Sequence, residues 1–573
     1  MNSSGKFNYF FRGSPLFRVL CFFSAVALIL VSVLFISYKL KRIPSIDNIN
    51  PPIGSPGDVV IITGRNFGGV RGPGYVEFGG SRLTASSYIS WNEKEIKVVL
   101  PPNVQDGLVV VGTDTARSKP SFFANERDIP VAVPPNPQTS LPVITTLSGD
   151  TFRIGDLLVI SGSNFGNMNV DCGVYFATVR DDTTNPATTA LPFSNTRLSA
   201  LRADHIPANK TDFDYEYWSD TEIRVRIPDG ATSGMLYVET SKGDSALQKI
   251  TIESKNGGKK FLSRRTYLLQ LAANISDVVP DKSATIKMYF PRPSCLSSQP
   301  LVEMTECTPE PAIADYQNTV IHQLQAEKNT ILARKPFSEN FVISVYEINT
   351  TVKPELVTSY ANMNNMLYTA AIRADKCVPA GDPEIISLSR KITGKEMNPY
   401  KKAGLIYNYM LDNYTLQAVK SDVSPALDLI KKKKGDAYDF AVIYTALLRA
   451  SGIPALPDSG VLVDRDMKTR NHWWSEFYIC GVGWIPVDPA LGAGLSYKSW
   501  TETGNAREYY FGSLDSQHIT FSRGWKEIKP GAGNSKIVQR PRSYALQSIW
   551  EESSHSTLRY SSFWADPVVL GIY

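Results

Sequence analysis

The chain has 573 residues, 43% of them hydrophobic and 11% aromatic, and its 60 basic and 55 acidic residues give a formal net charge of +5. This length predicts about three to five domains, and the apolar content excludes a wholly disordered chain. The nearly balanced charge lacks the basic excess of nucleic-acid-binding proteins, so no nucleic-acid partner is expected.

The N-terminal region contains one long apolar segment. Residues 19–36 read VLCFFSAVALILVSVLFI and carry no charge. About 20 helical residues span the roughly 30 Å hydrocarbon core of a bilayer. The segment ends in YKLKR rather than in a small-residue cleavage site, which favours an uncleaved signal anchor over a signal peptide. We therefore predict a cytoplasmic tail and a transmembrane helix in 1–42, with the span at about 19–38. The bulk of the chain is then expected to be extracytoplasmic, in the periplasm or at the cell surface.

Two segments farther along the chain repeat the same pattern. GDVVIITGRNFG at 57–68 matches GDLLVISGSNFG at 155–166 position for position, and SWNEKEIKVVLP at 90–101 matches YWSDTEIRVRIP at 217–228. Each segment alternates β-branched and polar residues between Gly, Pro and Asn turns. This pattern is typical of short antiparallel strands in a β-sandwich.

Both repeats resemble the immunoglobulin-like TIG (IPT) domain, the first over 43–128 and the second over 142–253. The second contains an added stretch near 178–212, rich in Thr, Asn, Ala and Asp, which is expected to be a surface loop. Residues 129–141 contain IPVAVPPNP, an extended Pro-rich linker. TIG domains occur in transcription factors and in cell-surface proteins. The predicted anchor and the balanced charge favour the second setting, with a spacer or adhesive role.

Residues 262–380 carry no chemical motif but contain alternating runs, such as TIKMYF at 285–290 and FVISVY at 341–346. This alternation predicts a β-rich domain. A β-sandwich in front of a papain-like core is common in the family that the next region resembles.

Five cysteines lie outside the predicted membrane span, and an odd number leaves at least one without a disulfide within the monomer. Two of them flank a Pro/Ser-rich segment and could form a disulfide, which the sequence alone does not establish. These two are Cys295 and Cys307, and the others are Cys172, Cys377 and Cys480.

A series of spaced motifs lies in 383–523. The motifs are GDAYDFA at 435–441, SGIPA at 451–455, NHWWSEFY at 471–478 and GWIPVDP at 483–489. In this order they resemble the core of the transglutaminase-like superfamily, α+β papain-type folds with a Cys-His-Asp triad. The resemblance implies that His472 is the base and Asp488 the orienting acid. The nucleophilic cysteine of the family falls on Ala437.

A helix is predicted to begin after Asp436, which is a good N-cap residue. Asp439 stands three positions farther on and makes a capping-box-like pair with it. Apolar residues recur at helical spacing until Gly452 and Pro454, which end the helix. A thiol at position 437 would lie among the unpaired N–H groups of the first turn, where the helix dipole lowers its pKa. Ala437 offers no nucleophilic atom there.

The segment YICGVGW at 478–484 forms a turn between two strand-like runs. Folding the chain back about position 480 places His472 directly opposite Asp488, with Cβ atoms about 4.5–5.5 Å apart. The carboxylate can then accept from the imidazole and fix its tautomer. The same fold-back places Cys480 some 25 Å from His472, at the tip of the hairpin. Cys480 is therefore excluded as a substitute nucleophile, and Cys377 has no motif around it.

The predicted fold class is multidomain. It comprises an N-terminal transmembrane helix, tandem immunoglobulin-like β-sandwiches, a β-rich domain, an α+β papain-like transglutaminase core and a C-terminal extension at 524–573. No cofactor or metal is expected.

The leading functional hypothesis is a membrane-anchored cell-envelope protein with an inactive transglutaminase-like domain, a pseudoenzyme. It would bind a protein or peptide at the transglutaminase-like cleft or at the TIG domains, or serve a structural role. One alternative is an active acyltransferase or peptidase with an unrecognised nucleophile. Another is an adhesin-like protein in which the TIG pair binds and the core only supports it. Loss of the nucleophile alone removes most of the catalysis of a triad, which disfavours the enzyme.

Overall fold

The computed structural model describes Ser24, Val26 and residues 43–573, with internal gaps. The gaps are 52, 55–56, 80, 102–103, 105–106, 115, 126–140, 167, 169–171, 181–203, 211, 315–317, 333, 361–362, 364, 419–424, 526–537, 541 and 547–548. Most of the predicted linker at 129–141 and of the predicted loop at 178–212 therefore lies outside the described residues.

The predicted transmembrane helix is not supported. Among the residues that the structure describes, no helix is long and apolar enough to cross a membrane. The predicted span at 19–38 lies outside the described residues, apart from Ser24 and Val26. Apolar composition is a property of sequence and does not by itself establish a spanning helix. The fold class is therefore corrected to a multidomain, mostly β protein with an α+β core.

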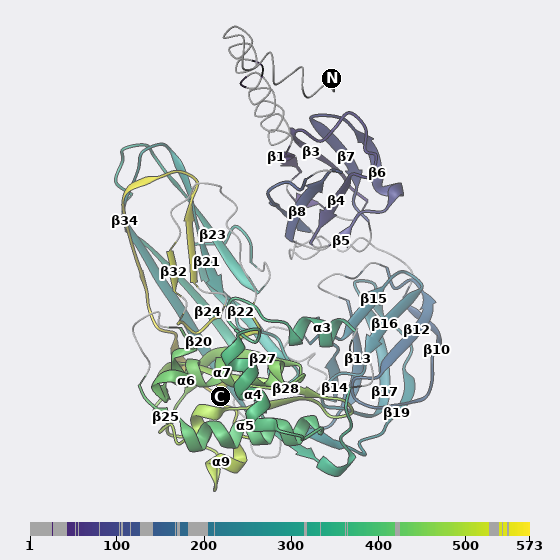
Figure 1. Ribbon diagram of the computed structural model, residues 1–573, viewed down its shortest axis with the longest axis vertical. Coiled ribbons are helices and arrows are strands. Elements are labelled where there is room, and N and C mark those ends of the chain that lie inside the picture. Colours follow the sequence, from purple (N-terminus) through teal and green to yellow (C-terminus); the bar gives the residue numbers. More distant parts are fainter. Residues whose placement is uncertain are drawn as a thin grey trace, which may run out of the picture. The chain divides into compact units, whose positions relative to one another are not determined.

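The chain divides into two compact units, 1–128 and 129–573. The first contains a sandwich of two sheets, coloured purple in Figure 1. One sheet has the order β1-β3-β7-β6 and the other β2-β9-β8-β4-β5. Their bounds are β1 Ser45–Asn50, β2 Ile53–Gly54, β3 Val59–Arg65, β4 Tyr75–Phe78, β5 Ser81–Arg82, β6 Tyr88–Trp91, β7 Glu95–Val99, β8 Gly107–Gly112 and β9 Ser121–Asn125, with a 3-10 turn η1 at Ala85–Ser87.

The second unit begins with a sandwich of the same topology. Its sheets have the orders β10-β12-β16-β15 and β11-β19-β17-β13-β14, with β18 paired to β17. Each strand takes the place of its counterpart in the first sandwich. The bounds are β10 Val143–Leu147, β11 Thr151–Phe152, β12 Leu157–Ser163, β13 Gly173–Thr178, β14 His205–Pro207, β15 Tyr215–Trp218, β16 Glu222–Arg226, β17 Ala231–Thr240, β18 Gly243–Asp244 and β19 Gln248–Ile252.

The repeated Asn-Phe-Gly motif has the same structural role in both sandwiches. Asn66 and Asn164 have positive φ angles of 62° and 61°, a conformation that asparagine tolerates better than most residues. Asn66 Nδ2 donates to the carbonyl of Ile43 at 3.1 Å, and Asn164 Nδ2 donates to that of Leu141 at 3.2 Å. The sequence repeat is therefore a repeat of turn geometry.

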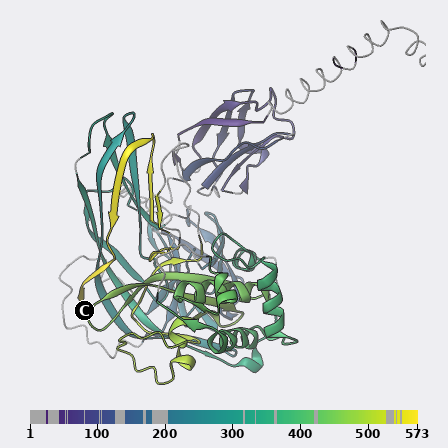
Figure 2. The same cartoon turned by 60° about the vertical axis from the view of Figure 1, so that its left-hand side comes forward.

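A third sandwich contains the longest strands among the described residues, β20 (Gly257–Pro280) and β24 (Lys335–Val352). One sheet has the order β22-β24-β20-β34 with β30 and β35 beside it, and the other has the order β23-β21-β33-β32. The remaining bounds are β21 Ala284–Pro291, β22 Leu301–Thr308, β23 Thr319–Ala326, β30 Ser513–Leu514, β32 Val538–Arg540, β33 Ile549–Ser553, β34 Thr557–Trp564 and β35 Val568–Ile572. The predicted β-rich region and C-terminal extension thus supply strands to the same sheets, and Figure 2 shows the yellow C-terminal strands beside the teal ones.

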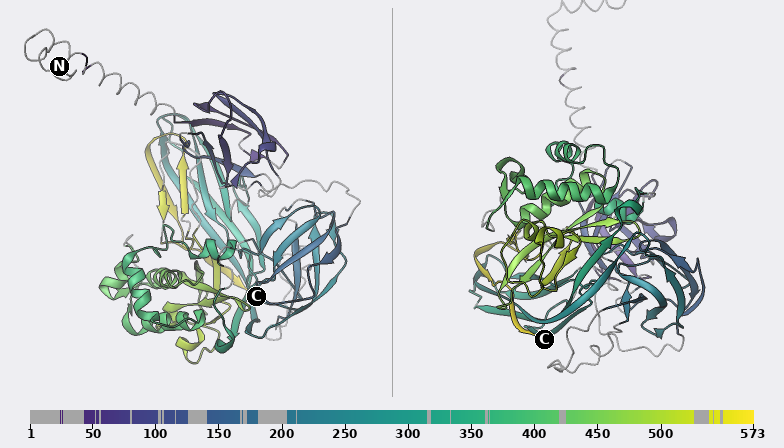
Figure 3. Two further views of the ribbon diagram at one scale, coloured as in Figure 1. Left: turned by 45° about the vertical axis from the view of Figure 1, so that its right-hand side comes forward. Right: turned by 90° about the horizontal axis from the view of Figure 1, so that it is seen from below.

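The α+β core has a four-stranded sheet in the order β29-β28-β27-β31, with helix α7 (Ala437–Ala450) against it. Nearly every residue of α7 is buried, because β27, β28, α4 and α5 contact it from several sides. Figure 3 shows the green helices gathered on one side of this sheet. The remaining bounds are η4 Pro354–Leu356, α3 Met366–Ile372, α4 Pro383–Thr393, α5 Pro399–Asn413, β25 Thr415–Leu416, α6 Asp428–Lys432, β26 Lys434–Gly435, β27 Ala455–Val463, β28 Thr469–Ile479, β29 Gly483–Val487, α8 Pro489–Gly492, α9 Ala506–Tyr509 and β31 His518–Arg523.

Gly64 is the glycine of the repeated motif in the first sandwich, and its position has no room for a side chain. Gly64→Ala should therefore destabilise this sandwich. An added Cβ would lie 2.0 Å from the carbonyl oxygen of Ser45 and 2.4 Å from the ring of Phe67. Because backbone must move to relieve this contact, we expect a loss of about 2 kcal/mol or more in the free energy of unfolding of this unit. Calorimetry of the full chain measures it.

Gly69→Ala is the matched control, since its added Cβ would meet nothing within 4 Å. The control should change the free energy of unfolding by less than about 0.5 kcal/mol. Equal melting temperatures for the two variants would contradict the steric account.

Candidate active site

Helix α7 begins as the sequence predicts. Asp436 Oδ1 accepts from the backbone N–H of Asp439, and the N–H of Asp436 donates to Asp439 Oδ2, both at 3.1 Å. The two bonds form a reciprocal capping box and satisfy two donors of the first turn. Ala437 is the first helical residue and is 4% exposed.

An arginine from the C-terminal region also holds the start of this helix. Arg542 Nη1 donates to both carboxylate oxygens of Asp436, at 2.9 and 2.8 Å, and Nη2 donates to Asp439 Oδ1 at 3.0 Å. Its guanidinium lies 4.4 Å from the centroid of the Tyr438 ring. Both aspartates are buried, so a bound cation offsets much of the cost of removing their charges from water. No sequence pattern indicated Arg542, because its partners lie more than a hundred residues away.

His472 and Asp488 form the pair that the sequence predicts. His472 lies in β28, and Asp488 follows β29 and caps α8 by accepting from the N–H of Leu491 at 2.8 Å. His472 Nε2 lies 2.5 Å from Asp488 Oδ2, and both residues are buried. A proton on Nε2 would fix the tautomer and leave Nδ1 as the acceptor that a general base needs.

The register that places this pair differs from the predicted one. Ser475 pairs with Val487, which centres the turn at position 481 rather than 480. Continuing this register sets Trp474, not His472, opposite Asp488, so the predicted direct opposition is wrong. The contact still forms, because residues two apart on a strand point to the same face and a diagonal neighbour remains within reach.

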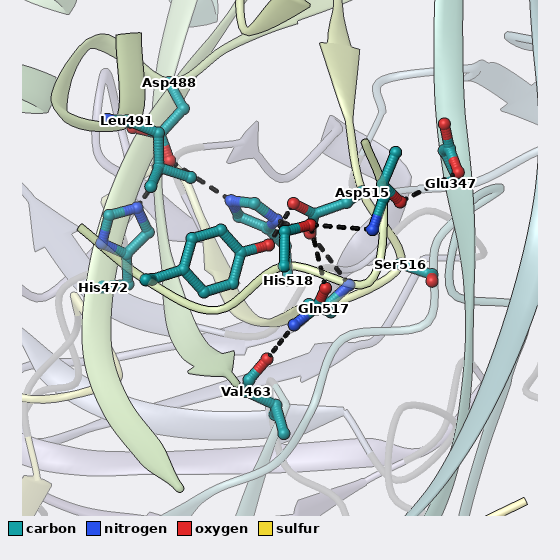
Figure 4. Close-up of polar contacts among 12 residues, drawn as sticks. Glu347, Val463, His472, Asp488, Leu491, Asp515, Ser516, Gln517 and His518 are labelled. Carbon is teal, nitrogen blue, oxygen red and sulfur yellow. Dashed lines mark hydrogen bonds and ion pairs between the residues drawn. The ribbon is translucent and has the colours of Figure 1, made fainter. Parts of the chain in front are cut away.

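A second histidine, which no sequence motif indicated, completes the polar network in Figure 4. His518 Nε2 lies 3.2 Å from Asp488 Oδ2, and its Nδ1 lies 2.8 Å from Asp515 Oδ1. Asp515 also accepts from the hydroxyl of Tyr510 at 3.0 Å. Asp515 and His518 stand three positions apart, which is the only local signal that could have linked them.

The network is charged although it is buried. Burial alone would lower the pKa of His518, but the charges and hydrogen bonds of Asp515 and Asp488 outweigh it and raise that pKa to about 9. Burial likewise acts to raise the pKa of Asp488, yet His472 and His518 hold it well below its usual range. His518 is therefore an imidazolium near neutral pH, and both of its ring N–H groups donate to carboxylates.

Helix α7 packs against the strand that carries His472. The Tyr438 ring meets the Trp473 ring edge-on, with centroids 5.7 Å apart. Ser475 Oγ donates to the carbonyl of Ala441 at 2.9 Å. The residues that follow Ala437 and His472 are thus in contact. The triad roles of Ala437, His472 and Asp488 stay a prediction from the resemblance.

Neither cysteine near the core offers a reactive thiol at the start of α7. Cys377 Sγ lies 3.7 Å from Tyr438 Oη, close to the start of α7, but burial raises the pKa of its thiol to about 12. The backbone of Cys480 accepts from Asn256 Nδ2 at 3.3 Å, at the tip of the hairpin as predicted. Cys307 is a free thiol, so the Cys295–Cys307 disulfide considered from the sequence is not formed.

The donor atoms of His472, Asp488 and His518 lie within 4.8 Å of one another and are of types that bind metals. However, the 2.5 Å contact between His472 and Asp488 is much shorter than the ~3.3 Å expected for two ligands of one tetrahedral zinc ion. Asp488 is hydrogen-bonded to both histidines, and the positive charge of His518 compensates its negative charge.

Comparison with known proteins agrees with the two sequence resemblances. Residues 386–489 match the model of the transglutaminase-like superfamily, and residues 44–124 match that of the IPT/TIG domain. The chain thus contains a transglutaminase-like core preceded by an IPT/TIG domain.

Several proteins share parts of the chain. A Haemophilus influenzae protein described as uncharacterized is 31% identical over 163 residues, 23% of this chain and 44% of that protein. A cyclomaltodextrin glucanotransferase of Paenibacillus macerans is 45% identical over 58 residues, 10% of this chain and 8% of the enzyme. The chain thus spans less than half the length of these relatives.

Two solved structures are also similar. A candidate cysteine protease from Cytophaga hutchinsonii has 17% identity and a TM-score of 0.33, over 54% of this chain and 92% of that one. The periplasmic domain of TgpA from Pseudomonas aeruginosa has 12% identity and a TM-score of 0.22, over 39% of this chain and 86% of that one.

The stability of the core should fall as the pH rises from about 6.5 to about 9. His518 binds its proton more tightly in the folded state, where its pKa is about 9, than in the unfolded state, where it is about 6.5. Its contribution is thus complete below pH ~6.5 and is lost through pH ~9, on the order of 3 kcal/mol in all. Urea unfolding of the core across this range, followed by tryptophan fluorescence, measures the slope.

His518→Gln should flatten that slope, whatever it does to stability at one pH. His555→Gln replaces an exposed histidine and should leave the slope unchanged. Identical slopes in the wild type and His518→Gln would contradict the charged state of His518.

Proposed function

We propose that the transglutaminase-like domain is catalytically inactive and serves as a module that binds a protein or peptide. The observation that carries this proposal is the side chain at the first position of α7, where Ala437 has only a methyl group. A methyl group cannot attack a carbonyl or form a thioester. The polar partners that would serve a thiol there, His472 and Asp488, are nevertheless in contact.

The hydroxyl groups between α7 and β28 support this proposal. Thr445 Oγ1 and Ser475 Oγ each lie 2.9 Å from the carbonyl of Ala441 and 2.9 Å from one another. Both are buried. Hydroxyls bound to a backbone carbonyl and to one another have no adjacent base to activate them.

A second candidate function is an acyltransferase or peptidase with an unrecognised nucleophile. The contact between His472 and Asp488 favours it. The pair alone carries little catalysis, since removing the nucleophile of a triad costs about as much as removing all three members. A further version of the binding hypothesis is that the TIG sandwiches bind the partner and the core only supports them. The extracytoplasmic location stays a prediction from the sequence.

The hypothesis of inactivity predicts that the purified chain neither incorporates a labelled amine into a glutamine substrate nor hydrolyses peptides. The wild type, His472→Ala and the control His555→Ala should all show no turnover above background. Turnover that disappears only in His472→Ala would overturn the proposal. Turnover that survives in His472→Ala would locate an activity elsewhere in the chain and would also count against an inactive protein.

Ala437→Cys should place a reactive thiol at the start of α7, near His472. The positive end of the helix dipole and His472 should lower the thiol pKa below the usual ~8.5 and speed alkylation near neutral pH. The rate of iodoacetamide labelling against pH measures this pKa, and His472→Ala in the same background should raise it.

Ala450→Cys is the matched control, because it introduces the same side chain at the other end of α7, where the dipole disfavours a thiolate. Its thiol pKa should be at or above ~8.5. A folded Ala437→Cys variant whose thiol titrates like the control would show that the helix start and His472 no longer form a nucleophile site. That result would favour the purely structural hypothesis.

A further inference from the structure

We propose that Cys307, His322 and Glu339, in the long-stranded sandwich, form a binding site for one zinc ion. Their ligating atoms all lie within 4.8 Å of one another. The site belongs to the third sandwich and shares no residue with the candidate active site.

The fold brings the three side chains together from both sheets of the sandwich. Cys307 in β22 and Glu339 in β24 are direct cross-strand partners, so both side chains point to the same face of their sheet. His322 lies in β23 of the other sheet. His322 and Glu339 are 1% and 0% exposed, whereas Cys307 is partly exposed. The cluster therefore lies between the sheets, with a path to solvent at Cys307.

The three groups converge on one point. His322 Nε2 is 3.8 Å from Cys307 Sγ and 2.9 Å from Glu339 Oε1. A Cys-His-acid triad needs the thiol and the acid on different ring nitrogens, whereas here the same nitrogen faces both. Two ligands of a tetrahedral zinc ion lie ~3.6 Å apart for S and N and ~3.3 Å apart for N and O. The two distances from His322 Nε2 thus differ from these values by a few tenths of an ångström, and Cys307 Sγ lies within 4.8 Å of the Glu339 carboxylate.

The buried carboxylate is incompletely satisfied by protein groups. Among the described residues, Glu339 Oε2 and His322 Nδ1 have no hydrogen-bond partner. A buried carboxylate oxygen without a partner is costly, and a cation coordinated by the carboxylate would remove that cost. A thiolate, a carboxylate and a neutral imidazole together carry two negative charges, which one Zn²⁺ neutralises.

The surroundings also suit a metal site. The ring centroids of Phe290 and Phe337 lie 5.2 and 5.1 Å from the centroid of the His322 ring. Both phenyl rings pack against the imidazole and restrict its orientation. Cysteine, histidine and carboxylate are the ligands that zinc takes in proteins, and a water can occupy the fourth position. The rival interpretation is a structural His322–Glu339 hydrogen bond beside a thiol that binds no metal.

Cobalt(II) added to the chelator-treated full chain tests the site. A bound cobalt ion with a thiolate ligand gives a sulfur-to-metal charge-transfer band in the near ultraviolet. We expect this band at one equivalent of cobalt, and its loss when zinc is added. His472→Gln should keep the band, because the donors of the other buried cluster include no thiolate.

Cys307→Ser should abolish the band and weaken zinc binding by at least about tenfold. Cys295→Ser, at an exposed cysteine, is the matched control and should keep both. Glu339→Gln preserves the shape of the side chain and should also weaken zinc binding, which provides a second test if Cys307→Ser does not fold. A wild type without the band, or a band that persists in Cys307→Ser, would overturn the proposal.

Discussion

The sharing of one carboxylate oxygen by two imidazoles organises the α+β core. Asp488 Oδ2 lies 2.5 Å from His472 Nε2 and 3.2 Å from His518 Nε2. His472 and His518 lie in strands on either side of β27, opposite Gly460 and Leu462 respectively. Asp488 therefore ties β28, β31 and the end of β29 together. A carboxylate buried in this way is tolerable because the His518 imidazolium and the hydrogen-bonded His472 are fixed around it.

A second buried charge group fixes the start of the central helix. Asp436 and Asp439 cap α7 reciprocally, and Arg542 forms ion pairs with both of them from a region that also supplies strands to the third sandwich. The helix start, and with it position 437, therefore depends on the C-terminal region as well as on the core. Both charge groups are present in a core whose residue at position 437 is an alanine. Both groups stabilise the packing of the core, so the proposed binding or structural use of the fold accounts for their presence.

Local features of the sequence predicted the local structure well. The capping box at Asp436 and the repeated Asn-Phe-Gly turns are short-range patterns, and the structure contains both. The His472–Asp488 pair was predicted with the correct face but the wrong register. Ile479 pairs with Gly483, so the turn is centred on Gly481, whose φ angle of 77° suits glycine, and not on Cys480.

The features that the sequence did not predict depend on distant parts of the chain. Arg542 reaches α7 across more than a hundred residues, and His518 meets Asp488 only because β31 pairs with β27. No spacing rule links such partners.

Two expectations from the sequence were not met. The transmembrane helix is not supported among the described residues, and the Cys295–Cys307 disulfide is not formed.

The charge state of His518 tests most directly the claim that a buried charge network holds His472 and Asp488 in contact. Nitrogen-15 chemical shifts of histidine-labelled protein, assigned with His518→Gln, report the protonation of each ring nitrogen. The account predicts that both nitrogens of His518 stay protonated at neutral pH and titrate near pH 9. A His518 ring that loses its proton near the ordinary value of about 6.5 would contradict it.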